Sequence, residues 1–391
     1  MRPEDSSVIG HRNDGRSEMQ QMSVAAAIAI ALSIVVVTPA GASFRGANGW
    51  IAYESSPTGA EIDREIWVTR ESDGWEAVRL TTDLTPRRDL FPAVSPNGRE
   101  IAFSRRHPTE ADDTELWTMH ATDADGDGFG DAIAPLTDNS VGDVHAAWSP
   151  SGKQLAYASN PPEAPAAQSS DIYVMKRCDP SKTPLRLPRD PSTVSNQHPV
   201  FSPDGDWVVW AGLYAGPAPD VDLLITKADG SGPVIKLTNT PGPVGETHPE
   251  FSPDGTQLAF SSNRDKTGDG IPDDQDVYLM RVFERDAEGN LVLTPESATN
   301  VPASSTDAMA DAATGVKTNE RWPAWSPDGR SIAVWSGLGA ASSPSQRPGI
   351  WVVDVSGAQP AVRITDPLVN PAPLRPDWGP TSAKTKETCK Q

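Results

Sequence analysis

One phrase recurs five times along the chain and limits its fold more than any other feature. Each copy joins a short apolar run to Ser-Pro, a turn residue, Gly and a second apolar run. The copies are FPAVSPNGREIAFS (91–104), HAAWSPSGKQLAYAS (145–159), HPVFSPDGDWVVWA (198–211), HPEFSPDGTQLAFSS (248–262) and WPAWSPDGRSIAVWS (322–336). Their Ser-Pro serines, at 95, 149, 202, 252 and 326, are separated by steps of 54, 53, 50 and 74 residues. A period of this length with one insertion predicts a repeat architecture, in which many small cores form side by side.

Each copy belongs to a unit of four short strands. The first strand ends before Ser-Pro, the Gly supplies the positive φ of a tight turn, and an alternating second strand follows. The third strands read EIWVT from 65, ELWTM from 115, DIYVM from 171, DLLIT from 222, DVYLM from 276 and GIWVV from 349. The fourth strands read VRLT from 78, APLT from 134, LRL from 185, IKLT from 235 and VRIT from 362. Four repeated strands of this kind are typical of a propeller blade.

The two ends of the repeat region carry complementary parts of one unit. Residues 48–53 open at a second strand, whereas residues 375–380 form a first strand with nothing after it. Trp378 lies 53 residues after Trp325, which matches the repeat step. We therefore predict an all-β fold, a six-bladed β-propeller of four-stranded blades closed by a C-terminal strand that completes the N-terminal blade. The predicted blades cover about 48–88 with 372–380, 89–142, 143–195, 196–245, 246–318 and 319–371.

The N-terminal region predicts export. Residues 23–37 (SVAAAIAIALSIVVV) are too short for a membrane span but match the apolar part of a signal peptide, and Ala40-Gly41-Ala42 is a small-x-small cleavage pattern. We expect a signal peptide over 1–42, the propeller over 43–380 and a disordered tail over 381–391. The alternative is an uncleaved N-terminal anchor, because the charges before the apolar run nearly cancel. Either way the propeller works outside the cytoplasm, as a periplasmic, cell-surface or secreted protein without a transmembrane domain in the mature chain.

Charge and cysteine content narrow the partners and the compartment. A formal net charge of −20 argues against nucleic acid, because a polyanion is repelled. The same charge suits a cation or a basic partner, and we expect a monomer. Cys178 and Cys389 are the two cysteines. An oxidising compartment permits a disulfide between them, and two free thiols are the alternative.

The phrase HPxFSPDGxxLAFxS followed by DxYxM resembles the WD40-like repeat of TolB-like propellers, over essentially all of residues 48–380. The resemblance implies a six-bladed propeller. The chain differs from TolB, which carries an α/β domain before its propeller, because only residues 43–47 separate the expected cleavage site from the first blade. It also lacks the Gly-x-Ser-x-Gly elbow, and the room for a hydrolase domain, that prolyl-oligopeptidase-like relatives contain.

Two Asp-rich loops match the spacing of calcium sites, in which Gly permits a sharp turn and hard oxygens bind the cation. The first would use side chains at loop positions 1, 3, 5, 9 and 12 and one backbone carbonyl: Asp265, Thr267, Asp269, Ile271, Asp273 and Asp276. The second would use Asp123, Asp125, Asp127 and Asp131, and has Ala134 at position 12. Solvated acidic hairpins are the alternative for both. We expect any bound calcium to stiffen these loops rather than to take part in catalysis.

Three histidines occupy one repeat position in consecutive blades. They are His145, His198 and His248, and acidic Asp143 and Glu246 lie two residues before the first and the last. At the mouth of the channel, imidazoles and carboxylates could bind a ligand or hold a transition metal. A structural role is the alternative, with each histidine hydrogen-bonded to backbone of the neighbouring blade.

These features lead to two functional hypotheses. The first is a non-catalytic scaffold that binds a protein or a glycan across one propeller face. The second is a metal-dependent carbohydrate-active enzyme, a lyase or hydrolase, that uses the histidine ring. Residues 283–318 contain the insertion, which we expect to be a long surface loop where partners are met. Most of the 12 tryptophans recur at repeat positions, so inter-blade packing is their expected role.

Overall fold

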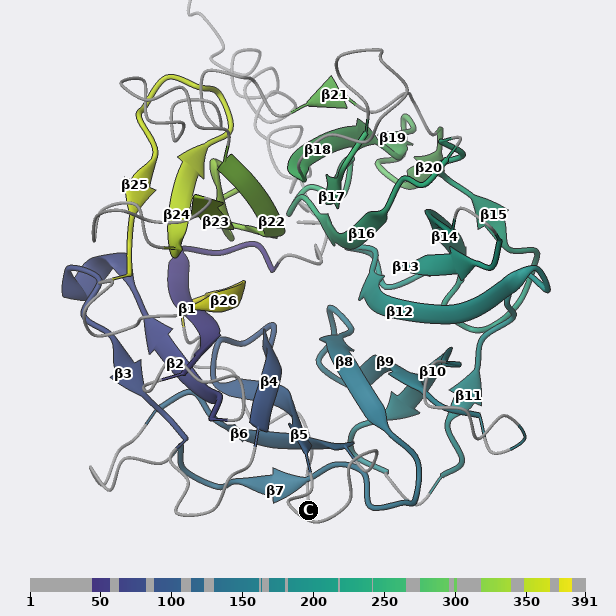
Figure 1. Ribbon diagram of the computed structural model, residues 1–391, viewed down its shortest axis with the longest axis horizontal. Coiled ribbons are helices and arrows are strands. Elements are labelled where there is room, and N and C mark those ends of the chain that lie inside the picture. The colour runs from purple at the N-terminus through teal and green to yellow at the C-terminus, as the bar shows by residue number, and fades with distance from the viewer. Residues whose placement is uncertain are drawn as a thin grey trace, which may run out of the picture. The chain divides into compact units, whose positions relative to one another are not determined.

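The computed structural model describes residues 44–56, 63–81, 88–106, 114–122, 130–161, 163, 169–179, 182–216, 219–240, 242–264, 275–294, 299–300, 318–338, 348–365 and 373–381. These residues form six four-stranded antiparallel sheets that stand around a common centre, as the predicted propeller requires (Figure 1). The expected signal peptide, and the expected tail apart from Thr381, lie outside the described residues. Within the described part of the chain, no helix is long and apolar enough to cross a membrane.

The strands follow the same order in every blade, from the centre to the rim (Figure 1). The innermost strands are β26 (Leu374–Pro380), β4 (Arg88–Val94), β8 (Asp143–Trp148), β12 (Thr193–Phe201), β16 (Glu246–Phe251) and β22 (Thr318–Trp325). The second strands are β1 (Asn48–Ser55), β5 (Glu100–Arg106), β9 (Gln154–Ser159), β13 (Trp207–Tyr214), β17 (Gln257–Ser262) and β23 (Ser331–Leu338). The third strands are β2 (Glu65–Thr69), β6 (Thr114–His120), β10 (Asp171–Lys176), β14 (Asp220–Lys227), β18 (Asp276–Arg281) and β24 (Gly349–Asp354). The rim strands are β3 (Val78–Arg79), β7 (Ala134–Pro135), β11 (Leu185–Arg186), β15 (Ile235–Lys236), β21 (Thr299–Asn300) and β25 (Val362–Arg363), and one short 3₁₀ helix, η1, covers Glu71–Asp73.

The Ser-Pro turn joins the first strand to the second through side-chain hydrogen bonds. In blade five the Ser252 hydroxyl donates to Asp254 Oδ1 over 2.6 Å and accepts from the Gln257 backbone N–H over 3.0 Å. Gly255, at φ +77, takes the left-handed position that the turn needs. The same Ser-to-Asp bond recurs in blade six, from Ser326 to Asp328. The repeated Ser-Pro-Asp-Gly phrase therefore encodes the turn itself.

The hydrophobic core consists of six clusters, and each joins two neighbouring blades. A propeller of this size thus replaces one large core by several small ones, as the repeat predicts. The cluster between blades six and one includes Ile51, Tyr53, Ala333, Ile350 and Trp378, all almost fully buried. Its side chains come from both ends of the chain, so the ring is closed by the same packing that joins the other blades.

The closing strand pairs as the sequence predicts. β26 is antiparallel to β1, with Ile51 opposite Trp378 and Ala52 opposite Asp377. The backbone N–H of Thr381 also donates to the carbonyl of Ala47 over 2.9 Å. Blade one is therefore complete only when the two ends of the repeat region meet.

The insertion in blade five is only partly the surface loop that the sequence predicts. β19 (Phe283–Arg285) and β20 (Leu291–Leu293) form a separate two-stranded sheet. Phe283 is fully buried in the cluster between blades four and five, so this hairpin belongs to the core. Residues 295–298 and 301–317 of the insertion lie outside the described residues. The apolar Val282 and Phe283 were the signal that distinguished this part of the insertion from a loop.

Candidate functional site

Six side chains from the innermost strands meet in the central channel. All occupy the repeat position of the three predicted histidines, and all are non-glycine residues with φ between 50 and 59: Phe91, His145, His198, His248, Trp322 and Arg375. Each lies where the pairing register of its innermost strand shifts by a β-bulge. Positive φ is strained for residues with a Cβ, and a bulge redirects a side chain out of the regular alternation. The repeat uses this strained bulge in every blade to turn one side chain toward the channel.

These six side chains pack against each other and form a ring, which we call the channel ring. Neighbouring ring centroids are 4.0 Å apart between Phe91 and His145, 4.1 Å between His145 and His198, and 3.8 Å between His198 and His248. The centroids of His248 and Trp322 are 5.7 Å apart. The Arg375 guanidinium completes the circle, 5.0 Å from the Trp322 ring and 4.3 Å from the Phe91 ring.

The three imidazoles are neutral at physiological pH. Burial, with the neighbouring charge of Arg375, lowers the pKa of His198 to about 3. Burial is also the main cause that lowers the pKa of His145 and of His248 well below the ordinary value. His248 Nε2 accepts from the Trp322 indole N–H over 2.7 Å, and its Nδ1 lies 2.9 Å from Thr247 Oγ1. Nδ1 of His145 and of His198 is buried and has no hydrogen-bond partner among the described residues.

The two carboxylates predicted to join the histidines bind side chains outside the channel ring. Asp143 is 1% exposed and accepts from the Asn139 amide over 2.7 Å. Glu246 is fully buried and accepts from Arg264 Nε over 2.7 Å. Blade two repeats the arrangement with a bidentate pair of Asp89 and Arg105, at 2.7 and 2.8 Å. Asp89 and Glu246 therefore connect the first strand of a blade to its second strand or to the residues just after it, whereas Asp143 binds the segment before its own strand.

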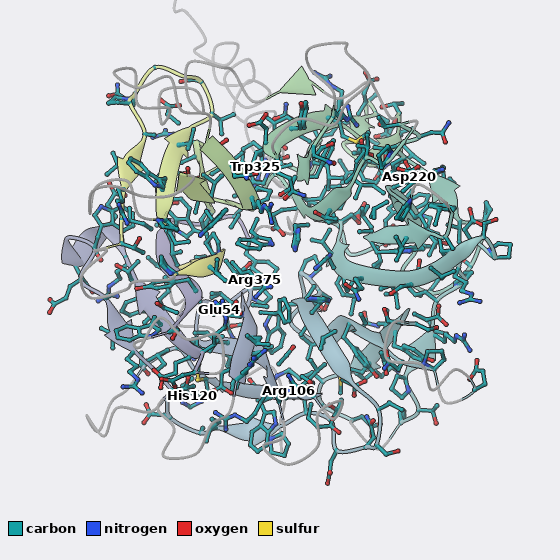
Figure 2. All side chains as sticks on the ribbon, viewed as in Figure 1. Glu54, Arg106, His120, Asp220, Trp325 and Arg375 are labelled. Carbon is teal, nitrogen blue, oxygen red and sulfur yellow. The ribbon has the colours of Figure 1, made fainter. Side chains whose placement is uncertain are left out.

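One ion pair does reach the channel ring. Glu54, fully buried on β1, pairs with Arg375 of the closing strand and with Arg64 at 3.4 Å (Figure 2). A second oxygen of Glu54 accepts the backbone N–H of Phe91 over 3.0 Å. Burial nevertheless raises the pKa of Glu54, against the effect of both arginines. The single cation of the ring is thus balanced by a carboxylate from the N-terminal part of the chain.

A cavity of about 150 Å³ opens on one side of the channel ring. Its walls come from the residues that follow the ring in each innermost strand, with Phe44 and Trp378 among them. Two carboxylates line it, Glu250 and Asp377. Burial raises the pKa of Asp377 to about 7, and its Oδ2 accepts the Val94 N–H over 2.6 Å. The sequence prediction did not include these two acids. Their signal is the repeat position itself, where the other four blades carry small apolar residues: Ala93, Ala147, Val200 and Ala324.

A second hollow, of about 490 Å³, lies between the Ser-Pro turns of blades five and six. Arg45 and Gly46 line it together with the turn residues Asp254 and Asp328. We call this second hollow the cleft. Phe44 lines the cavity, and the next two residues, Arg45 and Gly46, line the cleft, so the two hollows lie next to each other on one face.

Three tryptophans that are off the repeat pattern have structural roles. Trp210 is buried and donates its indole N–H to Asn196 Oδ1 over 2.9 Å. Trp207 packs on Phe283 of the inserted hairpin, with ring centroids 6.0 Å apart. Trp75 packs against the cluster that closes the ring between blades six and one.

The predicted calcium loops fall mostly on residues 123–129 and 265–274, which lie outside the described residues. Asp131 and Asp276 are described. Asp276 begins β18 and is 6% exposed. Four other blades have an acid at this position, namely Glu65, Glu115, Asp171 and Asp222. Three of these four pair with a basic residue of the rim strand, so this acid is a feature of the repeat as well as of the loop.

The fold and the channel ring together define the class of protein. It is a six-bladed β-propeller whose channel is filled by side chains of the innermost strands. The fold is similar to that of TolB from Acinetobacter baumannii, with a TM-score of 0.57 at 17% identity over 85% of this chain and 67% of that one. It is similar to hydrazine synthase from Kuenenia stuttgartiensis, with a TM-score of 0.59 at 14% identity over 90% of this chain and 50% of that one. A putative TolB from Agrobacterium tumefaciens aligns with a TM-score of 0.45 at 21% identity, over 75% and 91% of the two chains. No protein-family model and no curated protein matches the sequence. The chain is a TolB-like β-propeller in fold.

Proposed function

We propose that this chain is an exported, non-catalytic scaffold that binds a protein or glycan partner across the face that carries the Ser-Pro turns. The observation that carries the proposal is the channel ring. Its imidazoles are neutral and packed against each other, and its one cation is paired with Glu54. The imidazoles and the guanidinium of the ring are thereby used for packing and closure. What remains for function is the surface of the propeller and its two hollows.

The enzymatic alternative needs histidine nitrogens that converge on a metal. In the channel ring the centroids of neighbouring imidazoles are 3.8 to 4.1 Å apart, and Nε2 of His248 already accepts the indole N–H of Trp322. Among the described residues, no three His, Cys, Asp or Glu side chains are grouped as metal ligands. This geometry favours the scaffold over a metal-dependent carbohydrate-active enzyme.

Two observations support export. Residues 23–42 carry the apolar run and cleavage pattern of a signal peptide. Cys178 is disulfide-bonded, and disulfides persist in oxidising compartments such as the periplasm or the extracellular space. The other cysteine of the sequence, Cys389, lies outside the described residues.

The face of the two hollows is the surface we assign to the partner. The cavity offers aromatic walls with two carboxylates, and the cleft offers Asp254, Asp328 and Gln257. With a net charge of −20, a partner that is basic or neutral is favoured over an acidic one. Concave sites with few polar groups are typical of binding sites.

Photo-crosslinking from opposite ends of the propeller tests this assignment. A photoreactive residue at Gln257 lines the cleft, and a matched one at exposed Ser192 lies where an innermost strand begins, away from the turns. We expect a discrete protein or glycan adduct from position 257 and none from position 192. Equal adducts from both positions would contradict the assignment to this face. Turnover of oligosaccharides with added Mn²⁺ that is abolished by His198→Phe would instead establish the enzyme.

We further propose that calcium stiffens the two Asp-rich loops. The donor set of Asp265, Thr267, Asp269, Ile271, Asp273 and Asp276 offers the hard oxygen ligands that calcium requires, and Asp123, Asp125, Asp127 and Asp131 offer a smaller set. Chelation with EDTA is expected to lower Tm by several degrees, and calcium is expected to restore it. Asp269→Ala should remove most of the response. An unchanged melting curve in EDTA would end the calcium proposal.

A further inference from the structure

The cleft lies between two successive Ser-Pro turns and has walls of mixed polarity. Its volume, about 490 Å³, lies within the range of about 300–1,000 Å³ that is typical of sites for small molecules. The turn residues Asp254 of blade five and Asp328 of blade six line it, together with Arg45 and Gln257. Two carboxylates, a guanidinium and an amide therefore border one space.

Asp254 and Arg45 place a hydrogen-bond acceptor and a donor side by side. Asp254 Oδ1 accepts the Ser252 hydroxyl and the Thr256 backbone N–H, whereas its Oδ2 has no partner among the described residues. Burial raises the pKa of Asp254, but these hydrogen bonds and the charge of Arg45 outweigh burial and hold the pKa below its ordinary value. Exposed Arg45 makes one hydrogen bond with the described residues, from Nε to the Pro253 carbonyl, and no ion pair with them. Its two Nη groups are thus open to a ligand.

The wall from blade six repeats this mixture of donors and acceptors. Asp328 uses Oδ1 for its own turn, and its Oδ2 accepts the Asn48 amide over 3.4 Å. Trp325 of β22 is 2% exposed and lines the cleft, and its indole N–H has no partner in the described part of the chain (Figure 2). Buried donors normally have an acceptor, and Trp148 at the same repeat position has one in the Ala93 carbonyl. The cleft therefore adjoins a donor that the fold leaves unsatisfied.

We propose that the cleft is a sugar-binding site, in which hydroxyl groups of a glycan donate to Asp254 and Asp328 and accept from Arg45. A hydroxyl both donates and accepts hydrogen bonds, so it matches walls on which carboxylates alternate with donors. A cationic group is disfavoured beside Arg45, and an anionic group is disfavoured beside two carboxylates. This inference rests on the proposed scaffold and deepens it, because it takes the glycan as the partner and places it in the cleft.

Titration with neutral disaccharides, followed at Trp325, tests the site. The protein is labelled with fluorotryptophan, and the Trp325 signal in the ¹⁹F NMR spectrum is assigned with Trp325→Phe. Maltose, cellobiose, lactose and N,N′-diacetylchitobiose are then added in turn. We expect a saturable shift of the Trp325 signal with at least one of them. No shift with any of the four sugars would overturn the proposal, and a shift with L-argininamide instead would make the cleft a site for a basic side chain.

Substitution of the turn aspartates has a matched control within the repeat. Asn97 of blade two shows that asparagine keeps the turn, because its Oδ1 accepts the Ser95 hydroxyl over 2.8 Å. Asp254→Asn and Asp328→Asn should therefore fold, and each should raise the Kd of the responding disaccharide ~10-fold, since hydrogen bonds to charged groups are the stronger ones. Asp204→Asn, at the same turn position of blade four and not part of the cleft, should leave the Kd unchanged. Equal effects of the three substitutions would overturn the proposal.

Failure of this inference is distinguishable from failure of the proposed function. If no sugar binds but photo-crosslinking from position 257 still captures a protein, the sugar site is wrong and the partner face stands. If position 257 and position 192 give equal adducts and no sugar binds, both proposals fail.

Discussion

Blade one and blade three have the same four-stranded topology but carry different residues at two positions of the innermost strand. Blade three is continuous in the chain, and the cavity-lining residues of its innermost strand include His145 and Ala147. Blade one is assembled from both ends of the repeat region, and at the same two positions it carries Arg375 and Asp377. The repeated residues therefore build the propeller, and the seam, where β26 meets β1, departs from the repeat at both of these positions.

Substitution of two tryptophans at one repeat position should have the largest effect on the free energy of unfolding, and it compares the two blades directly. Trp148 in blade three is 4% exposed and donates to the Ala93 carbonyl over 2.9 Å, and Trp378 in blade one is 5% exposed. Replacing either by Ala removes a large buried side chain, so each should cost ~3–5 kcal/mol of unfolding free energy. Because β26 follows blade six in the chain and is held in blade one by non-covalent contacts, Trp378→Ala should also open β26 locally.

Hydrogen exchange distinguishes these two effects. In Trp378→Ala, amides of β26 and β1 should exchange faster than those of the other blades. In Trp148→Ala, protection should fall by a similar amount across all blades. A uniform loss of protection in both variants would show that the seam is as cooperative as the rest of the ring.

The buried ion pair of the seam gives the next largest effect. Arg375→Met leaves Glu54 fully buried with only Arg64 beside it, and breaking a buried pair in this way is expected to cost ~3 kcal/mol. His145→Phe at the matching position of blade three should cost ~1 kcal/mol or less, because Phe91 shows that the ring accepts a phenyl group at positive φ. Urea denaturation measures both. A double variant Arg375→Met, Glu54→Gln should regain part of the loss, and a larger cost for His145→Phe would reverse the comparison.

The repeat carries almost all the information on the fold. Ser-Pro-Asp-Gly turns, alternating strands and the two complementary ends are local signals, so six blades and their closure follow from the sequence. The meeting of His145, His198 and His248 at one ring also follows, because equivalent positions of a propeller converge. Their packing against each other depends on the positive φ at the bulge. No residue type in the phrase reveals that conformation.

The cavity acids show a different limit of sequence reasoning. Glu250 and Asp377 are ordinary acidic residues when each is read alone, and only comparison across blades shows that Ala or Val is the rule there. Their surroundings also depend on Phe44, which precedes the first repeat and matches no pattern. These two acids depart from the repeat, so the cavity they line is recognised only when equivalent positions of all six blades are compared in the structure.

The smallest expected effect is a pair of opposite pH dependences, one from His198 of the ring and one from Asp377 of the seam. The folded-state pKa of His198 is lowered to about 3, so below about pH 6.5 the unfolded chain takes up a proton that the native ring does not bind. The stability conferred by the neutral ring is thus full above about pH 6.5 and is lost as pH falls toward 3. The folded-state pKa of Asp377 is raised to about 7, so its contribution is full below about pH 3.9 and is lost as pH rises to 7. Relative to the unsubstituted chain, His198→Phe should therefore gain stability at pH 4 over pH 8, and Asp377→Asn should gain at pH 8 over pH 4. Thermal melts of the three chains between pH 4 and 8 measure both slopes, and slopes of the same sign would contradict the assigned protonation states.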